Sequence, residues 1–254
     1  TGSGSFYREV ARTADCAPED VVAGDLVLYN NQPGTVWGPE GEFVSAPRLD
    51  DLACVFACTE GFLTAQERDM VPVLCVFDNE EIGSETKQGA ASVFLPETLA
   101  AISEALGLSA ADHRALLADS MMLSCDNGHA RHPNHPELAD TNEAPVPNGG
   151  VVVKHSPRYA TDAVSAAAFQ EICRRAQVPT QHYANRPDQM GGSTLGNIAD
   201  TKLPIPTVDI GMAQLAMHSC FETMGSRDVE AFVRAVRACY ESSLRCTPEG
   251  VALR

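Results

Sequence analysis

Several short apolar runs lead into side chains that ligate metals or move protons. These side chains are Glu80 and Glu81 after residues 73–77, Asp126 after residues 121–125, and His218 beyond residues 207–211. Another acidic pair, Asp50 and Asp51, opens a predicted helix. Neighbouring carboxylates in a cleft repel one another and normally need a cation or a shared proton. With an imidazole they suit zinc, manganese or cobalt, so the residue types indicate a candidate metallohydrolase.

The same acids also have structural explanations. Acids at a helix start satisfy free N–H groups and favour the helix dipole, which accounts for Asp50 and Asp51 without any metal. Glu80 and Glu81 precede Gly83-Ser84, and a solvated turn would suit them equally well. Composition and spacing leave these alternatives open.

The elements that would position these side chains follow from apolar periodicity. Helices are predicted over residues 6–18, 52–63, 89–107 and 161–175, with a last helix capped by Asp228, and strands over residues 25–29, 71–77, 120–125, 151–154 and 207–211. Strands that alternate with helices of this length favour an α/β layered fold with a mixed, largely parallel central sheet. In such folds the ligand site lies beyond the carboxyl ends of the strands.

Composition excludes several classes of protein. The 254 residues carry a formal charge of -16, which would repel a phosphate backbone, so nucleic-acid binding is not expected. No apolar run is long enough for a membrane span, so no membrane partner is expected. Nine cysteines without the regular spacing of a disulfide framework favour a reduced, cytosolic setting. Cys54 and Cys58 are interpreted as small core residues.

Six spaced motifs together resemble one known family. They are Arg48-Leu-Asp-Asp-Leu52; Asp78-Asn-Glu-Glu-Ile-Gly-Ser84 with Gly89-Ala90; Asp126 with His129 and His132-Pro-Asn134; Tyr159-Ala-Thr161; Gly192-Ser-Thr-Leu-Gly196; and Gln214-Leu-Ala-Met-His-Ser219 with Glu222. In order and spacing they resemble the M18 aminopeptidases, the aspartyl aminopeptidase family of metallopeptidases. The resemblance covers essentially the whole chain and is weakest before residue 20.

The resemblance implies a three-layer, phosphorylase/hydrolase-like α/β fold with a co-catalytic dizinc site that releases N-terminal residues from peptides. By match to the family's motifs, Asp50 would bridge two Zn²⁺ ions, Glu81 and His218 would complete one site and Asp126 would ligate the other. Glu80 would be the general base.

The substrate-binding residues implied by the resemblance are Lys154, His129, Gly192 and Thr194. Lys154 matches a family lysine that receives an acidic substrate side chain, which implies a preference for N-terminal Asp or Glu. Mn²⁺ and Co²⁺ remain alternatives to zinc. A strand-end lysine, a satisfied loop histidine and a simple glycine-rich turn are the structural alternatives for these positions.

The sequence also departs from the family pattern. Family members are longer, and no histidine precedes His113, so a metal-binding histidine upstream has no counterpart and one metal is expected to be lost or completed from elsewhere. Residues 1–46 are expected to be a remnant of the dimerisation-domain region, and residues 47–254 the C-terminal portion of the catalytic domain, truncated at its N-terminus. Asp51 replaces the asparagine usual beside the bridging acid, which adds charge and alters how Asp50 is oriented.

These departures lead to competing hypotheses. The leading one is a metal-dependent aminopeptidase that prefers acidic N-terminal residues. A second is a catalytically incomplete fragment that serves only as an assembly or binding module. A third, another metallopeptidase or deacetylase of the same clan, fits the motifs less well. The expected partners are a peptide substrate and either further copies of the chain or a missing N-terminal half.

Overall fold

A computed structural model describes residues 3–66, 69–189, 191–247 and 250–253. The chain forms two compact units, Thr1–Asn31 and Gln32–Arg254. The first unit contains the helix α1 (Ser3–Thr13) and the 3₁₀ turn η1 (Pro18–Asp20). The helix predicted over residues 6–18 is therefore confirmed, although it ends at Thr13.

The strand predicted over residues 25–29 is wrong. The chain there has no regular structure, and Val27 and Leu28 are almost fully exposed. A strand is stabilised by hydrogen bonds to a neighbouring strand, and no described residue supplies one here.

A mixed sheet forms the centre of the second unit. Its order is β3 (Met122–Cys125), β7 (Thr207–Gly211), β5 (Val151–His155) and β6 (Thr180–Ala184). The pairs β3–β7 and β5–β6 are parallel, whereas β5 and β7 are antiparallel. The predicted mixed α/β class with a largely parallel sheet is thus confirmed.

A second sheet continues from the ends of β3 and β7. Its order is β1 (Thr35–Trp37), β2 (Phe43–Ala46), β9 (Glu222–Gly225), β8 (Ala213–Leu215) and β4 (Gly128–His129), and a separate hairpin joins β10 (Leu244–Thr247) to β11 (Gly250–Leu253). The chain passes from β3 to β4 and from β7 to β8 in parallel. Asp126 and Asn127 therefore lie beside Gly211 and Met212, where the two sheets meet.

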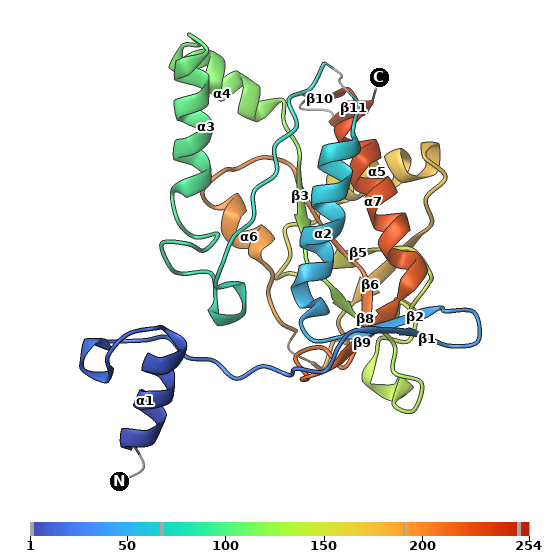
Figure 1. The fold of residues 1–254 in the computed structure, drawn as a ribbon. Helices are drawn as coiled ribbons and strands as arrows, with labels where there is room; N and C mark the ends of the chain where they lie inside the picture. Colours follow the sequence, from blue (N-terminus) through green and yellow to red (C-terminus); the bar gives the residue numbers. More distant parts are fainter. Residues whose placement is uncertain (1–2, 67–68, 190, 248–249, 254) are drawn as a thin grey trace. The chain divides into compact units, whose positions relative to one another are not determined.

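The second unit also contains several helices. They are α2 (Leu49–Thr64), α3 (Phe94–Ala105), α4 (Ala110–Ala118), α5 (Ala163–Arg175), α6 (Leu195–Asp200) and α7 (Ser226–Tyr240), with short 3₁₀ turns η2 (Glu80–Ile82) and η3 (Pro136–Leu138). Figure 1 shows α2 and α7 side by side, and these two helices pack closely. A Cβ on Gly61 of α2 would lie only 2.8 Å from a methyl group of Val236, so glycine permits this approach.

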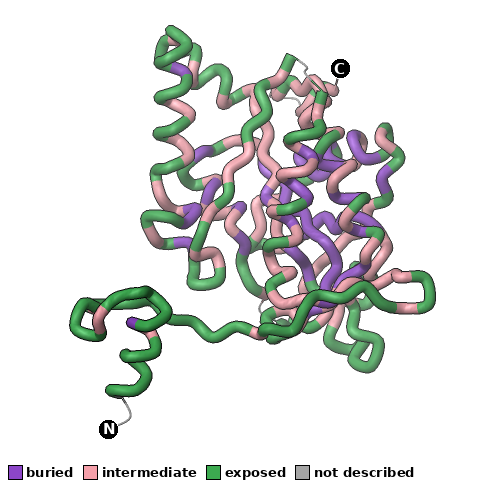
Figure 2. The backbone as a smooth tube through the Cα atoms, viewed as in Figure 1, coloured by how far each residue is buried: buried purple, intermediate pink, exposed green. Residues whose placement is uncertain are grey.

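The core lies between α2, α5, α7 and one face of the central sheet. Figure 2 shows the buried residues concentrated along these strands and helices. Val151, Val153, Val208 and Ile210 point into this core and are fully buried. Because side chains alternate along a strand, the residues between them project from the opposite face. Lys154, which follows this alternation, therefore lies on the face away from the helical core.

The strand predicted over residues 71–77 is also wrong. This segment has no strand pairing, and Val71, Val73 and Val76 are exposed. Its carbonyl at Val73 accepts a hydrogen bond from the hydroxyl of Tyr240. Like residues 25–29, it is apolar enough for a strand but has no partner strand among the described residues.

Other boundaries differ from the sequence predictions. The predicted helix 89–107 begins at Phe94, and α7 begins at Ser226 with Gly225 as its cap rather than Asp228. Periodicity missed α4, α6 and most short strands. Among the described residues, no helix is long and apolar enough to cross a membrane.

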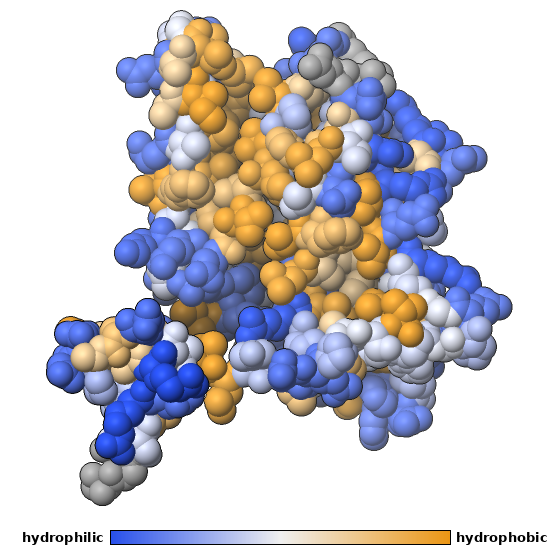
Figure 3. All heavy atoms as spheres, viewed as in Figure 1, coloured by the Kyte–Doolittle hydropathy of each residue, from blue (hydrophilic) through white to orange (hydrophobic). Residues whose placement is uncertain are grey.

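An apolar surface covers α2, α3 and the chain between them (Figure 3). We call it the α2–α3 apolar surface, and its exposed large residues are Leu52, Phe56, Leu63, Val71, Val73, Val76, Val93, Phe94 and Ile102. Single exposed apolar residues are common on proteins, but a contiguous group of this kind is typical of a surface that another polypeptide covers.

Candidate metal centre

The start of α2 brings Asp50 against the loop that carries His218. The Nε2 atom of His218 lies 3.2 Å from Oδ2 of Asp50 and 3.1 Å from Oε2 of Glu81. The Asp50 side chain is only 5% exposed, whereas Glu81 and His218 are open to solvent. One buried carboxylate, one exposed carboxylate and one imidazole therefore converge.

Glu222 holds this arrangement together from β9. One of its carboxylate oxygens accepts a hydrogen bond from the N–H of Asp50 at 2.9 Å, and the other accepts one from the N–H of His218 at 2.7 Å. Glu222 is 2% exposed. A buried carboxylate thus fixes the backbone of both segments.

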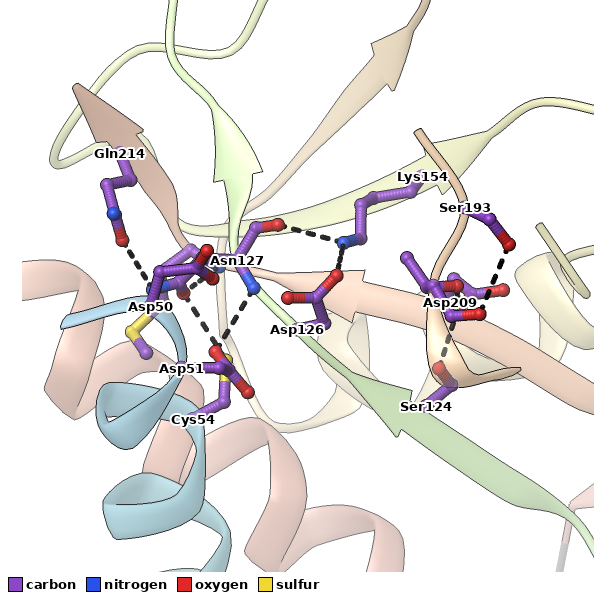
Figure 4. A network of polar contacts seen from close by, with 12 residues as sticks. Asp50, Asp51, Cys54, Ser124, Asp126, Asn127, Lys154, Ser193, Asp209 and Gln214 are labelled. Atoms are coloured by element: carbon purple, nitrogen blue, oxygen red, sulfur yellow. Dashed lines mark hydrogen bonds and ion pairs between the residues drawn. The ribbon is translucent and has the colours of Figure 1, made fainter. Parts of the chain in front are cut away.

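A second group forms where β3 ends. Lys154 Nζ lies 2.9 Å from Oδ2 of Asp126 and also donates to the carbonyl oxygen of Asn127 (Figure 4). A Cβ on Gly211 would collide with the carbonyl oxygen of Asp126, so only glycine lets the end of β7 approach this closely. The ends of β3 and β7 therefore meet beside the Lys154–Asp126 ion pair.

Asn127 links α2 to the two sheets. Its side-chain amide donates to the carbonyl of Leu49 and to Oε1 of Gln214, and its oxygen accepts from the N–H of Met212. Its own N–H donates to Oδ1 of Asp51 at 3.2 Å. Figure 4 shows Asn127 between the acids at the start of α2 and Lys154.

Two groups of metal-ligating atoms result, and they share Asp50. In the first, Asp50, Glu81 and His218 each offer a ligand atom, all within 4.8 Å of one another. In the second, Asp50, Asp51 and Asp126 do the same. The structure therefore brings together the four metal ligands expected from the sequence and adds Asp51.

The crowding of acids changes their proton affinity. Burial, and then repulsion from Asp126, Glu81 and Glu222, raises the pKa of Asp50 to about 8. Burial, and then repulsion from Asp126 and Glu81, raises the pKa of Glu80 to about 7. Burial also raises the pKa of Asp51 well above its usual range. Such shifts mark a site that favours protons or a cation.

The neighbouring acids stabilise the charged form of Lys154. Burial alone would disfavour its charged form, but the adjacent Asp126 carboxylate raises its pKa above the usual range. The ammonium group also lies 5.5 Å from the ring centre of Tyr159. Lys154 is therefore a buried, paired cation.

The chain's own atoms fit a bound cation. Oδ1 of Asp50 is buried and has no hydrogen-bond partner among the described residues. An unpaired buried carboxylate oxygen is costly, and a metal ion is one of the few partners that removes the cost. A cavity of about 530 Å³ opens at this point, lined by Arg48, Asp50, Asp51, Leu52, Glu81, His218, Ser219 and Glu222.

The backbone beside the site is strained at several positions. Arg48, Asn79, Ala216 and His218 have φ between 57° and 64°, in the left-handed region. Residues other than glycine adopt this region at a cost, and the surrounding structure must hold them there. The turns that present Asp50, Glu80 and His218 are thus locally unfavourable and are maintained by tertiary contacts.

The predicted substrate residues lie in different environments. His129 is an exposed residue on β4, but its ring is desolvated, and this desolvation and the nearby charges of His218 and Lys154 lower its pKa. Gly192 is exposed with open space around it. Thr194 is buried, and its hydroxyl donates to Asp209 at 2.6 Å instead of facing solvent.

Asp209 supports the loops around these residues. Its Oδ1 also accepts from the hydroxyl of Ser124 at 2.6 Å, and its Oδ2 accepts from the N–H of Ala160. The backbone N–H of Asp209 also donates to the hydroxyl oxygen of Thr161 at 2.8 Å. One buried acid on β7 therefore anchors both the 159–161 and 192–196 motifs.

Sequence reasoning missed Asn127, Asp209 and the role of Glu222. Asn127 directly follows Asp126, and Asp209 interrupts an apolar strand, which were the available signals. A buried acid in the middle of a strand normally has several hydrogen-bond partners, but spacing does not identify them.

Comparison with known proteins gives a consistent result. The family model described as aminopeptidase I zinc metalloprotease (M18) matches residues 3–240. A probable M18 family aminopeptidase 2 from Mycobacterium leprae is 41% identical over 244 residues, which are 95% of this chain and 57% of the relative. One from Clostridium acetobutylicum is 43% identical over 83% of this chain and 49% of the relative.

Solved structures are similar across the same region. Yeast aminopeptidase 1 superimposes with a TM-score of 0.82 at 32% identity, over 93% of this chain and 55% of that one. A Thermotoga maritima M18 aminopeptidase has a TM-score of 0.85 at 23% identity, which concerns the fold alone. The chain spans about half the length of the relatives it matches.

Proposed function

Because this chain belongs to the M18 family of zinc aminopeptidases, we propose that it hydrolyses N-terminal residues from peptides at the site around Asp50. The observation that carries the proposal is the pair of ligand groups that share Asp50, whose buried Oδ1 has no hydrogen-bond partner within the described part of the chain. An oxygen and nitrogen donor set of this kind suits zinc, with Mn²⁺ or Co²⁺ as alternatives.

In this proposal Asp50, Glu81 and His218 would hold one Zn²⁺ ion, and Asp50 and Asp126 would hold a second. Zinc bound there would polarise the scissile carbonyl and make water a better nucleophile. Lys154 holds Asp126 in its orientation through the 2.9 Å ion pair. Glu222 holds the backbones of Asp50 and His218 in place by accepting a hydrogen bond from the N–H of each.

Glu80 is the proposed general base. Its carboxylate would accept the proton of the attacking water and pass it to the leaving amine. A pKa of about 7, raised by burial and by Asp126 and Glu81, suits a group that must both accept and release a proton near neutral pH. Neighbouring Glu81 points instead towards His218.

An acidic substrate preference would depend on Lys154. Two of its three N–H donors are used by Asp126 and the carbonyl of Asn127, which leaves one for a substrate carboxylate. His129 lies on β4, in the same sheet as β8 and β9, the two strands that flank His218 in the chain. It would contact the substrate or the tetrahedral intermediate. Gly192 and Thr194 would shape the substrate end, with Thr194 acting through its backbone because Asp209 engages its hydroxyl.

The proposed partners are further copies of this chain or the remaining half of the family fold. The α2–α3 apolar surface supports a covering polypeptide, and one similar solved structure is described as a yeast dodecamer. The family boundaries, residues 1–46 for the dimerisation remnant and 47–254 for the catalytic portion, remain a prediction. So does a cytosolic location.

The same apolar surface favours a second candidate function. A catalytically incomplete fragment of such an enzyme would keep the fold and present this surface but turn over no peptide. It would then serve only as an assembly or binding module.

One experiment separates these functions. We would measure bound metal and the hydrolysis of peptides with N-terminal Asp or Leu on the same purified chain. Metal uptake with faster Asp release supports the proposed enzyme, and Glu80→Gln should then abolish turnover without loss of metal, because an amide cannot accept the proton. Equal metal loss in Glu80→Gln and Glu81→Gln would contradict this division of roles.

A further inference from the structure

The folded chain brings Asp51 close to Asp126, which its position in the sequence did not indicate. It lies at the start of α2, and its carboxylate offers an oxygen within 4.8 Å of ligand atoms on Asp50 and Asp126. Its Oδ1 accepts the N–H of Asn127 at 3.2 Å, and the carboxylate also has a hydrogen bond with the side chain of Cys54, so both partners orient it. The resemblance implied only Asp50 and Asp126 at this end of the site.

The unpartnered oxygen of Asp50 is an independent indication of a cation in this group. Asp50 directs Oδ2 towards His218, so Oδ1 is the oxygen left for a second cation. That oxygen is buried without a partner among the residues that the structure describes, on a side chain only 5% exposed. Three carboxylates without an intervening cation would repel one another strongly.

We infer that Asp51 is the third protein ligand of an all-oxygen cation site that it forms with Asp50 and Asp126. The inference rests on the proposed function, because it concerns the metal centre of the same site. It adds an Asp51 oxygen to the oxygens that Asp50 and Asp126 offer at the same place. It also makes the two halves of the metal centre chemically unlike.

The donor set selects the class of ion. Carboxylate oxygens without an imidazole suit hard divalent cations such as Mn²⁺ and Mg²⁺, whereas Asp50, Glu81 and His218 include a nitrogen that suits zinc. Together with the positive charge of Lys154, a divalent cation brings the formal charge of the three carboxylates to zero. We therefore expect one zinc-preferring and one manganese-preferring position.

The decisive variant is Asp51→Asn. The amide is nearly the same size and keeps an oxygen to accept the Asn127 N–H, but it lacks the anionic ligand oxygen. Removing one of three crowded carboxylates should leave the metal-free fold as stable as before or more so. Asp188→Asn, which removes an exposed acid paired with Arg186, is the matched control.

The test is a titration of the full chain after chelator treatment, first with Zn²⁺ and then with Mn²⁺, with free Mn²⁺ measured by electron paramagnetic resonance. We expect one tight ion of each kind in the unmodified chain and in Asp188→Asn. Asp51→Asn should keep the zinc and bind Mn²⁺ at least about 10- to 100-fold more weakly.

Each other result has a definite meaning. Unchanged Mn²⁺ affinity in Asp51→Asn overturns the inference. A single ion in the unmodified chain that Asp51→Asn retains also overturns it, but leaves the proposed aminopeptidase standing. No metal uptake by the unmodified chain overturns both, and peptide hydrolysis measured on the same samples distinguishes these cases.

Discussion

At the scale of single residues, the buried carboxylate of Glu222 is the strongest structural support of the candidate centre. It accepts one backbone N–H from the Asp50 segment and one from the His218 segment. Two segments far apart in the sequence thus share one acceptor group, so the position of both candidate ligands depends on it.

Glu222→Gln is expected to weaken zinc binding by about tenfold or more and to cost about 1–3 kcal/mol of unfolding free energy. The amide has one acceptor oxygen, and its NH₂ group would face a backbone donor. Zinc titration and urea unfolding would measure the two effects, with Glu230→Gln, an exposed acid on α7, as control. Zinc affinity equal to that of the unmodified chain would show that Glu222 does not position the ligands.

The sequence identified the individual acids but not their convergence. Asp50, Glu81, Asp126 and His218 were all expected, and the structure brings them together in two groups. Asp51 was expected only to alter the orientation of Asp50. Its place beside Asp126 depends on how α2 packs against the end of β3, which no local pattern encodes.

At the scale of elements, Asp228 attaches the loop before β5 to α7. Its carboxylate accepts the N–H groups of Asn148 and Gly150, at 2.6 and 2.9 Å. Burial raises its pKa to about 6 even though these two hydrogen bonds favour the charged form. The folded state therefore holds a proton more tightly than the unfolded chain does.

This shift predicts a pH dependence of stability. An acid whose pKa is raised on folding contributes stability below its unfolded pKa of about 4 and loses it as the pH rises through about 6. The difference in unfolding free energy between the unmodified chain and Asp228→Asn should fall by up to about 3 kcal/mol between pH 4 and pH 7. Urea unfolding with chelator at both pH values measures it, and a constant difference would refute the assignment.

Helices were predicted more successfully than strands for a physical reason. Helices such as α2 and α5 satisfy their hydrogen bonds locally, so periodicity over ten or more residues suffices. The strands predicted at 25–29 and 71–77 need a neighbour, and no described residue pairs with them. Their apolar character was recognised correctly, but a pairing partner was wrongly assumed.

At the scale of the whole molecule, the α2–α3 apolar surface is the most unusual feature. Leu63 and Val71 are 69% and 84% exposed there. Water contact with so much apolar area is unfavourable, and association with another polypeptide would relieve it.

The surface predicts self-association of the isolated chain. We expect sedimentation velocity to show species heavier than the 27.1 kDa chain, and Leu63→Glu with Val71→Glu to shift them towards monomer. Leu138→Glu, an equally exposed position in η3, should leave the distribution unchanged. A purely monomeric unmodified chain at the same concentration would contradict the prediction.

The amino-acid sequence, through the order, spacing and periodicity of its residues, was enough to indicate the family, the α/β class and the types of residue at the candidate centre. These features are local, because they depend on residue identity and on periodicity within single elements. The grouping of Asp51 with Asp126, the support by Glu222 and the pairing of Lys154 became visible in the folded chain alone. They depend on contacts between residues about 30 to 170 positions apart, and such contacts are set by the packing of α2, β3 and β9 and by nothing in their separate sequences.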